Sequence, residues 1–336
     1  MDDDDGSRTA GGWPRKELSV ARYTLRQLSY FLAVAETGTI SAAALRLHAS
    51  QSAVAAAVTE LERIFATQLM VRRKAHGISL TPAGSYLHSR AAELLAAAQE
   101  LELNVSSGGK ELAGPLVVGC YLTLAPTILP ALLEGFAAIH PKVQLDFVEG
   151  TQDGLQERLF AGELDLAVVY DMDLRPGLAS VRLYQARAYA LLPTDHRLAD
   201  RPEVTLESLA QDPMILLDAP PSSRHTMSLF ERAGVAPDIR YRTTDFELTR
   251  SLVGRKMGYS VLVQRPAVDT SYEGRDFVSR PITPAVQPVD VRIVWPEAVR
   301  LTDRARAMVD FATATVAQGT AAAGAAGRPG NDDTAR

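Results

Sequence analysis

The sequence lacks several features that would place it in other classes of protein. Cys120 is the one cysteine among 336 residues, so no disulfide can form within the chain. No apolar run approaches the roughly 18–20 residues that a membrane span needs. The start of the chain is acidic and has no apolar stretch of the kind that a secretory signal carries. We therefore expect a cytoplasmic protein that has no disulfides and no contact with a membrane.

The motifs of common enzymes are also missing. The six histidines show no metal-ligand spacing, and there is neither a Gly-x-Ser-x-Gly elbow nor a glycine-rich phosphate loop. Cys120 has no second cysteine to resolve an oxidised sulfur, so we expect a buried apolar residue there and no redox sensor. The sequence thus predicts no enzyme, no cofactor and no metal.

Hydrophobic residues make up 46% of the chain and charged residues 22%, which is typical of packed globular domains. The net charge of −5 is unevenly distributed. Residues 22–110 hold nine Lys and Arg against six Asp and Glu, whereas residues 111–336 hold 23 against 29. A basic N-terminal part on an acidic protein favours a polyanionic partner at that end only.

Composition divides the chain into five segments. Residues 1–20 and 318–336 have no apolar periodicity and are expected to be disordered tails. The Ser-Ser-Gly-Gly run at 106–109 indicates a linker between a helical first part and a second part in which short apolar runs alternate with helical stretches. The second pattern is typical of an α/β domain with a mostly parallel sheet.

The first part has the pattern of a helix-turn-helix. Apolar residues from Leu25 to Ala35 recur at helical spacing, and Gly38 ends that helix. A short helix runs from Ser41 to Leu47, and Ser50 can cap a third helix that continues to about Phe65. Two helices joined by a tight turn, with the second one amphipathic, favour insertion of the second helix into the major groove of DNA.

Two short strands around a basic turn follow and are expected to form a wing. Arg72, Arg73 and Lys74 in this turn would contact phosphates, although adjacent cations also occur in solvated loops. Thr81 and Pro82 then open a long helix. An apolar seam along this helix predicts dimerisation, and packing on its own domain is the alternative; the seam residues are Leu87, Ala91, Leu94, Ala98 and Leu101.

Residues 24–84 closely resemble the DNA-binding domain of LysR-type transcriptional regulators. The resemblance rests on Leu25-Arg26-Gln27-Leu28, Ile40-Ser41-Ala42-Ala43-Ala44, Ser50-Gln51-Ser52-Ala53-Val54 and Leu80-Thr81-Pro82-Ala83-Gly84. One departure is the run Ala55-Ala56-Ala57, where the family usually has polar or basic residues. Alanine can contact a thymine methyl but offers no hydrogen bond to a base, so we expect readout to rest on Gln51, Ser52, Thr59 and Arg63. The full set of expected DNA contacts is Arg26, Ser41, Ser50, Gln51, Ser52, Ala55, Ala56, Thr59, Arg63, Arg72, Arg73 and Lys74.

The second half resembles the effector domain of the same family, which is similar to type 2 periplasmic binding proteins. The resemblance includes Gly114-Pro115-Leu116-Val117-Val118-Gly119, the run from Leu159 to Ala167, and Met257-Gly258-Tyr259-Ser260. It implies two α/β lobes, the first formed by 115–183 and 282–317 and the second by 184–281. The expected fold is therefore multidomain: a winged helix-turn-helix at 22–80, a linker helix and hinge at 81–108, and a two-lobed α/β domain at 114–317.

A ligand is expected between the lobes, where strand ends meet helix N-termini. Thr123 can cap the helix after the first strand, and Ser222 and Arg224 open another helix. Hydroxyls, a helix N-terminus and an arginine together favour a small carboxylate or another anion, although plain capping and a surface ion pair are alternatives. The expected effector contacts are Tyr121, Thr123, Leu124, Tyr170, Ser222, Ser223, Arg224, Thr244, Gly258 and Tyr259.

These observations predict a transcriptional regulator that binds double-stranded promoter DNA and a small-molecule effector. The resemblance also implies self-association, first as a dimer and then as a homotetramer built from two dimers. An enzyme is disfavoured because no catalytic motif is found, and a solute-binding transport component is disfavoured by the helix-turn-helix. A poorly selective, nucleoid-type DNA-binding protein remains an alternative because of the alanines at 55–57.

Overall fold

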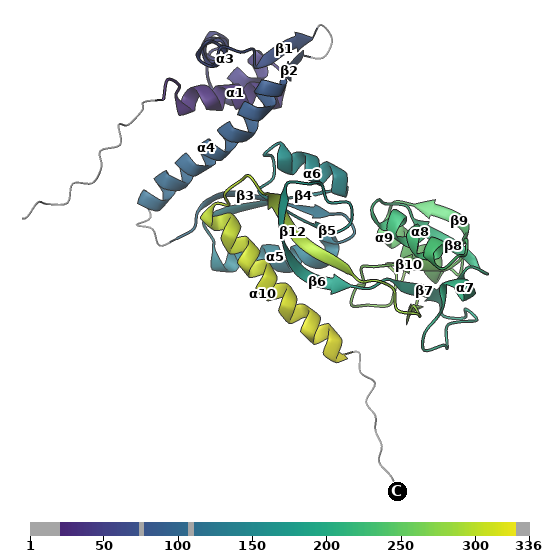
Figure 1. Cartoon of the computed structure of the whole chain (residues 1–336). Helices are drawn as coiled ribbons and strands as arrows, with labels where there is room; N and C mark the ends of the chain where they lie inside the picture. The colour runs from purple at the N-terminus through teal and green to yellow at the C-terminus, as the bar shows by residue number, and fades with distance from the viewer. Residues whose placement is uncertain (1–20, 74–76, 107–110, 327–336) are drawn as a thin grey trace, which may run out of the picture. The chain divides into compact units, whose positions relative to one another are not determined.

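The computed structural model describes residues 21–73, 77–106 and 111–326 (Figure 1). Contacts divide the chain into two compact units between Ala91 and Ala92, and each unit is described by itself. The expected tail at 1–20 and Lys74 lie outside the described residues. The expected fold is confirmed: a helix-turn-helix with a wing precedes a two-lobed α/β domain.

Three capped helices form the N-terminal unit. The hydroxyls of Thr24, Thr39 and Ser50 each accept a hydrogen bond from the backbone N–H three residues on, which fixes where the helices begin. Gly38 has φ 69°, the left-handed conformation that ends the first helix. The helices are α1 (Leu25–Thr37), α2 (Ile40–Arg46) and α3 (Gln51–Phe65).

Hydrogen bonds join the wing to the end of α1 and to α3. Strands β1 (Met70–Arg73) and β2 (Gly77–Leu80) pair antiparallel, as expected. The Ile78 N–H donates to the Gly38 carbonyl at 2.8 Å, so the wing is tied to the end of α1. The Glu62 carboxylate accepts from the N–H groups of Leu69 and Met70, which ties α3 to the start of the wing.

Helix α4 (Pro82–Ser106) begins where the sequence predicts. The Thr81 hydroxyl accepts from the Gly84 N–H at 3.0 Å, and Pro82 occupies the first helical position. Gly84 lies directly against the backbone of Leu69. A Cβ at position 84 would lie 2.0 Å from the Leu69 carbonyl oxygen, so only glycine allows this approach.

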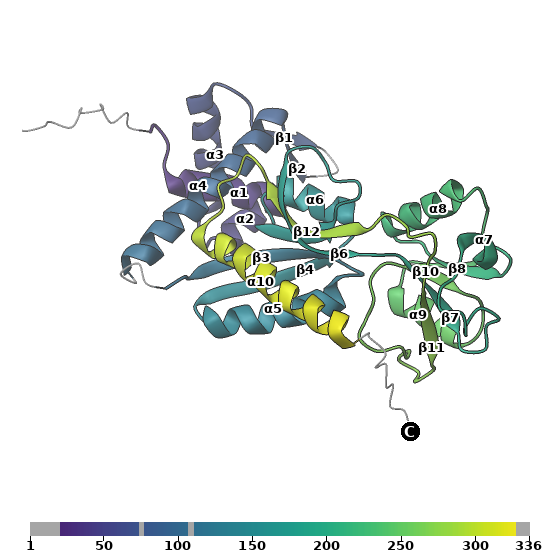
Figure 2. The ribbon, with the colours of Figure 1, turned by 60° about the horizontal axis from the view of Figure 1, so that its bottom comes forward.

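Lobe one of the second unit is a five-stranded sheet covered on both faces. Its strand order is β4-β3-β5-β12-β6, and helices α5 and α10 cover one face while α6 covers the other (Figures 1 and 2). Strand β3 pairs parallel with β4 and β5, whereas β12 runs antiparallel to β5 and β6 because it returns from lobe two. The sheet is therefore mixed, and not mostly parallel as expected. Its elements are β3 (Gly114–Tyr121), α5 (Ala125–Ile139), β4 (Val143–Gly150), α6 (Gln152–Phe160), β5 (Leu166–Tyr170), β6 (Leu178–Ala186), β12 (Val289–Pro296) and α10 (Asp303–Ala326).

Lobe two contains smaller sheets. Strands β10 and β11 flank β7 antiparallel, and β8 pairs parallel with β9. Hydrogen bonds of the Tyr259 backbone with Pro213 and Ile215 join the two sheets. The elements are β7 (Tyr189–Pro193), α7 (Leu206–Leu209), β8 (Pro213–Leu217), α8 (Ser222–Arg232), β9 (Asp238–Thr243), α9 (Phe246–Gly254), β10 (Ser260–Leu262) and β11 (Phe277–Pro281).

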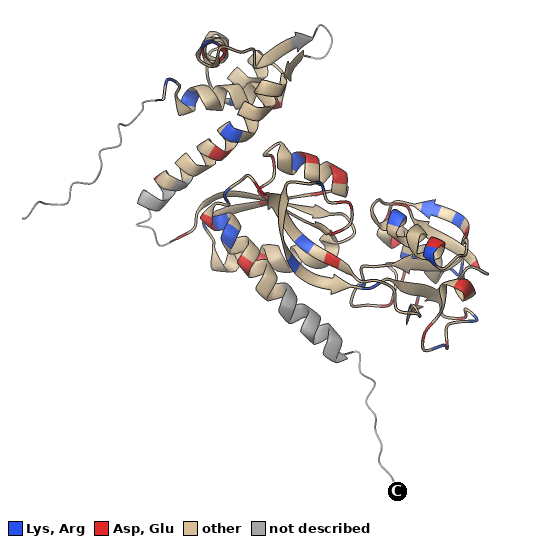
Figure 3. Ribbon diagram, viewed as in Figure 1, with Lys and Arg blue, Asp and Glu red and all other residues tan. Residues whose placement is uncertain are grey.

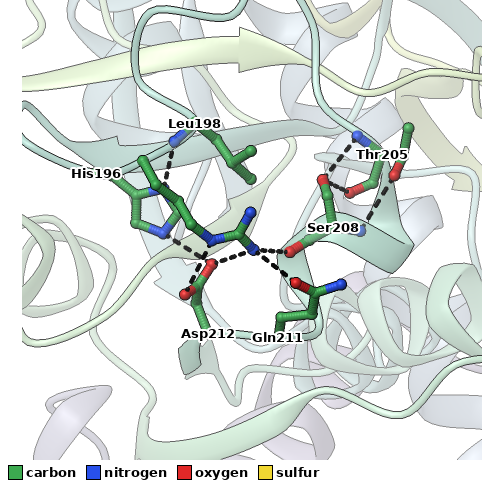
Figure 4. A network of polar contacts seen from close by, with 7 residues as sticks. His196, Leu198, Thr205, Ser208, Gln211 and Asp212 are labelled. Carbon is green, nitrogen blue, oxygen red and sulfur yellow. Dashed lines mark hydrogen bonds and ion pairs between the residues drawn. The ribbon is translucent and has the colours of Figure 1, made fainter.

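Hydrogen bonds and ion pairs join the residues of the segment between β7 and β8 (Figure 4). The Oδ2 atom of Asp212 lies 2.8 Å from Arg197 Nη2 and 3.3 Å from His196 Nε2. The His196 Nδ1 accepts from the Leu198 N–H, which orients the ring. Burial lowers the pKa of His196, so the neutral ring is the favoured form in this network.

One predicted tail is wrong in part. We expected a disordered tail at 318–336, but α10 continues to Ala326, so residues 318–326 are helical. Alanine has the highest intrinsic helix propensity and is abundant in this run. Residues 327–336 lie outside the described part of the chain.

Across the described ranges, no single helix is long and apolar enough to cross a membrane. Helices α1 and α2 reach that composition only as a pair, with a bend of 120° between them. Both contribute buried residues to the helix-turn-helix core, including Phe31 and Ala43.

We predict that Gly84→Ala destabilises the N-terminal unit. The added methyl collides with a backbone oxygen that no rotamer change can move, and such overpacking typically costs about 1–3 kcal/mol. Thermal unfolding followed by circular dichroism should show a transition at a lower temperature than in the wild type. Ser85→Ala, at the next and exposed position, is the matched control and should unfold as the wild type does. Equal unfolding of Gly84→Ala and wild type would contradict the close contact.

Candidate DNA-binding surface and effector cavity

Helix α3 presents a continuous exposed face. Gln51, Ser52, Ala56 and Thr59 are exposed and Ala55 is half-buried, whereas Val54, Ala57 and Leu61 form the buried face. The buried face docks α3 on α1 and α2, so the opposite face stands free for a partner. The structure thus brings Gln51, Ser52 and Thr59 to one surface, on which Ala56 offers only a methyl group.

Arg63 is placed on the same helix but is not free. Its Nε and Nη2 atoms donate to the two carboxylate oxygens of Glu60 at 2.8 and 2.6 Å. This bond raises the pKa of Arg63 and lowers the pKa of Glu60, so both side chains stay charged. The sequence analysis missed Glu60, although its position three residues before Arg63 is the signal of a helical ion pair.

The other expected DNA contacts surround α3. Arg26, Ser41 and Ser50 are exposed. Ser50 uses its hydroxyl as the cap of α3 and lies 3.1 Å from the Ser52 hydroxyl. Arg72 and Arg73 belong to β1, but their side chains lie outside the described parts of the structure, as does Lys74.

The predicted seam on α4 is only partly covered by its own chain. Ala91 is buried, and Leu87 and Ala98 are half-buried. Leu94 is 42% exposed and Leu101 is 65% exposed. The apolar side chains toward the C-terminal half of α4 therefore remain available to another surface.

A cavity lies between the two lobes of the second unit. Its empty space, including the opening to solvent, is about 250 Å³. Four hydroxyl groups, one amide and several apolar side chains line it, and none of the lining residues is Asp, Glu, Lys, Arg or His. The lining residues are Thr123, Tyr170, Leu217, Ser222, Thr226, Phe246, Val261, Leu262, Val263 and Gln264.

Tyr121 joins the lobes beside this cavity. Its hydroxyl donates to the Ala219 carbonyl at 2.8 Å and lies 3.2 Å from the Ser222 hydroxyl. Since the tyrosine proton goes to Ala219, Ser222 is the donor in the second bond. Burial raises the pKa of Tyr121, which keeps the phenol neutral and able to donate.

Thr123 does not cap a helix, contrary to the sequence-based expectation. Helix α5 begins after Leu124, with no side-chain cap. Only 3% of Thr123 is exposed, and its hydroxyl has no hydrogen-bond partner in the described part of the chain. The hydroxyl is close enough to oppose the rise in pKa that burial causes at Tyr170. Thr123 is thus a buried polar group that lines the cavity beside the Tyr170 hydroxyl.

Several other expected effector contacts are not among the lining residues. Leu124 and Tyr259 are buried in the core, and Gly258 approaches the Pro213 carbonyl so closely that a Cβ would lie 2.5 Å from it. Thr244 is exposed, and Asp245 takes the role of helix cap. Ser223 is buried next to Ser222 but does not line the cavity.

Arg224 is also outside the lining, where it forms an ion pair with lobe one. Its Nε and Nη2 atoms donate to one Asp173 oxygen at 2.9 and 2.5 Å. Figure 3 shows basic residues on α8 and β9 of this lobe. The sequence analysis missed Asp173, Thr226, Phe246 and Gln264, because only the fold brings these distant positions to the lobe boundary.

Cys120 is buried, as the sequence predicts. Desolvation raises the pKa of its thiol, so the thiolate is disfavoured. No group of three or more His, Cys, Asp or Glu side chains within the described ranges could hold a metal ion.

A winged helix-turn-helix joined to a two-lobed domain with an internal cavity defines a ligand-responsive DNA-binding protein. Two family models match the chain: "Bacterial regulatory helix-turn-helix protein, lysR family" over residues 25–85 and "LysR substrate binding domain" over residues 109–317. The chain belongs to the LysR family of transcriptional regulators. The expectation that it is a regulator and not an enzyme is thereby confirmed.

Known relatives cover both units. The crystal structure of HinK, a LysR family regulator from Pseudomonas aeruginosa, is 36% identical over 88% of this chain and 99% of that chain, with a TM-score of 0.59. The C-terminal domain of a probable LysR family regulator from Rhodococcus sp. RHA1 is 45% identical and covers 60% of this chain and 100% of that chain, with a TM-score of 0.59. The Hca operon transcriptional activator HcaR of Escherichia coli (strain K12) is 26% identical over 277 residues, or 81% of this chain and 91% of HcaR.

Proposed function

We propose that this regulator recognises a specific promoter site in the cytoplasm and that a small molecule bound between its lobes controls the outcome. The observation that carries the proposal is the free polar face of α3, with Gln51, Ser52 and Thr59 exposed on a firmly packed helix-turn-helix. A footprint on the DNA upstream of its own gene tests it. Two protected half-sites support specific regulation, whereas featureless protection supports a nucleoid-type protein.

The expected division of contacts on DNA follows from the side chains. Gln51, Ser52 and Thr59 can hydrogen-bond base edges, while Ala55 and Ala56 can only contact thymine methyl groups. Arg26, Ser41 and Ser50 are polar groups for the sugar-phosphate backbone, and the wing cations Arg72, Arg73 and Lys74 are proposed to contact phosphates. With two alanines on the reading face, shape and backbone contacts carry more of the affinity.

We predict that Glu60→Gln tightens DNA binding. The substitution removes a negative charge from α3 and releases the Arg63 guanidinium, which becomes available to a phosphate or a base. The affinity at low salt should rise by about threefold to tenfold, because one added phosphate contact changes affinity by this order. Fluorescence anisotropy with the footprinted duplex measures it.

Two further variants test the cause of the Glu60 effect. The double variant Glu60→Gln/Arg63→Gln should lose the gain, since the freed guanidinium is then absent. Glu102→Gln makes the same charge change on the exposed face of α4 and should leave the affinity unchanged. Weaker binding by Glu60→Gln would mean that the ion pair itself fits the DNA.

We propose that α4 pairs with its counterpart in a second chain. Leu94 and Leu101 are exposed in the single chain, and apolar side chains at heptad spacing bury well between two helices. Leu94→Glu/Leu101→Glu should shift the protein to smaller species in sedimentation velocity and abolish protection of paired half-sites. Unchanged sedimentation would place the dimer contact elsewhere. A dimer of dimers is the expected full assembly.

The effector is proposed to be a small carboxylate or another anion that enters the cavity. Thr123 and Ser222 offer hydroxyls there, and the first turn of α8 supplies the unpaired N–H groups of Ser222 and Arg224 and the positive end of a helix dipole. Arg224, on the same turn, is held by Asp173, so an anion that reaches it must replace this carboxylate. Occupation of the cavity can alter DNA binding only through different affinities for two arrangements of the lobes or subunits.

We predict that Thr123→Val raises the stability of the ligand-free protein and removes its stabilisation by the effector. Valine has the same shape and removes a buried hydroxyl that has no partner among the described residues, so ligand-free stability should rise by about 1 kcal/mol. Thermal shifts with a panel of small carboxylates and their methyl esters should identify acids that stabilise the wild type but not this variant. Stabilisation by the esters alone would reject an anionic effector.

A further inference from the structure

The loop between β5 and β6 presents an acidic side chain in a fixed position. Two fully buried glutamines of α6 hold this loop, and each uses both ends of its amide. Gln152 accepts from the Tyr170 N–H at 3.1 Å and donates to the Met172 carbonyl. Gln156 accepts from the Arg175 N–H at 2.7 Å and donates to the Asp173 carbonyl at 3.3 Å. The backbone on either side of Asp173 is therefore anchored to the core of lobe one.

Asp173 has a backbone conformation that suits its residue type. Its φ is 55°, in the left-handed region where Asp and Asn are found several times more often than most other residues. The anchored, left-handed turn directs the carboxylate to lobe two, where it meets the guanidinium of Arg224. Arg224 belongs to the first turn of α8, and an acidic group is favoured at such a helix end.

Within the described ranges, polar side chains join the lobes at three places besides the two chain crossings. Gln264 donates to the Thr127 hydroxyl at 2.6 Å and accepts from the Tyr184 hydroxyl at 2.8 Å. Tyr121 reaches Ala219 and Ser222 in the buried interior. The Asp173–Arg224 pair is about half-exposed, so it lies at the solvent-facing edge of the boundary.

We propose that Asp173 and Arg224 form an inter-lobe latch that holds the effector cavity shut while no ligand is bound. The Asp173 carboxylate then occupies the site at the first turn of α8 that would otherwise attract an anionic ligand. The latch regulates the cavity assigned above, and its biological purpose rests on that proposed function. The closure itself is a property of the lobes and is measured without effector and without DNA.

The anchoring of Asp173 distinguishes this pair from an ordinary surface ion pair. Exposed pairs usually contribute little because two mobile side chains must be ordered to form them. Here the backbone that carries the acid is already fixed by Gln152 and Gln156, so less conformational entropy is lost. The pair also joins two lobes, and its energy therefore acts on the lobe equilibrium and not only on local structure.

Hydrogen–deuterium exchange of the full-length protein tests the latch. The N–H groups of Ser222 and Arg224 have no acceptor in the described structure, whereas the Ser223 N–H donates to the Ala219 carbonyl, which also accepts from Tyr121 of lobe one. Exchange in this turn therefore depends on whether Tyr121 stays in contact with it. Asp173→Asn keeps the left-handed turn and removes the charge. Both Asp173→Asn and Arg224→Gln should speed exchange at 222–224 by about twofold to fivefold, the range that a modest ion pair supplies.

A double-mutant cycle and a matched control identify the cause. If both residues act through one contact, Asp173→Asn/Arg224→Gln exchanges no faster than either single variant. The control is Glu273→Gln, which breaks a similarly exposed pair with Arg255 inside lobe two and should leave exchange at 222–224 unchanged. Raising the salt concentration should speed exchange in the wild type but not in Asp173→Asn.

Two outcomes would overturn the latch: wild-type exchange in both single variants, or additive effects in the double variant. Tyr121→Phe serves as the second measure of closure. It removes the buried contacts to Ala219 and Ser222 and should speed exchange at 222–224 by about fivefold, the usual size of a lost neutral hydrogen bond. If Tyr121→Phe speeds exchange and the Asp173 and Arg224 variants do not, the lobes are closed by the buried contact alone.

Discussion

The hydrogen bond from the Tyr121 hydroxyl to the Ala219 carbonyl determines how the two lobes of the second unit meet. The chain crosses between the lobes only at 186–189 and 281–289, and these crossings leave a hinge motion possible. Tyr121 is fully buried and contacts Tyr170 edge-on, with ring centroids 5.6 Å apart. A polar contact in so dry an environment is costly to leave unsatisfied. Separation of the lobes would therefore break both contacts of the Tyr121 hydroxyl, to Ala219 and to Ser222.

The polar side chains that line the cavity come from both lobes. Thr123 and Tyr170 come from strand ends of lobe one, and Ser222 and Thr226 come from a helix of lobe two. With the lobes together, the Thr123 hydroxyl is buried and forms no hydrogen bond of good geometry within the described residues. The closed protein thus contains an unsatisfied group that a suitable ligand can satisfy.

Local signals in the sequence were sufficient for the DNA-binding unit. The caps at Ser50 and Thr81 and the helix end at Gly38 lie where the sequence predicts, because each depends on a few neighbouring residues. The alternation of strands and helices likewise predicted the α/β domain. The direction of β12 was not accessible from its sequence, because it depends on the return from lobe two.

The effector cavity was predicted less completely, for a physical reason. Thr123, Tyr170 and Ser222 line the cavity and were among the expected contacts, because they lie at strand ends or open a helix. Gln264 follows a strand as short as β10, and Asp173 lies in a loop whose course depends on two buried glutamines. Arg224 was correctly placed at the start of α8, but its partner is 51 positions away in the chain. Ion pairs across a lobe boundary leave no local pattern.

The alanines of α3 have a consequence for retargeting the protein. Ala56 is exposed and Ala55 half-exposed on a helix whose docking depends on Val54, Ala57 and Leu61. If α3 reads bases as proposed, larger side chains at 55 and 56 would replace only the methyl contacts of the alanines and would leave Val54, Ala57 and Leu61 in place. Most recognition helices must first lose an old preference before they acquire a new one. This helix can serve as a host on which new operator specificities are built by simple addition.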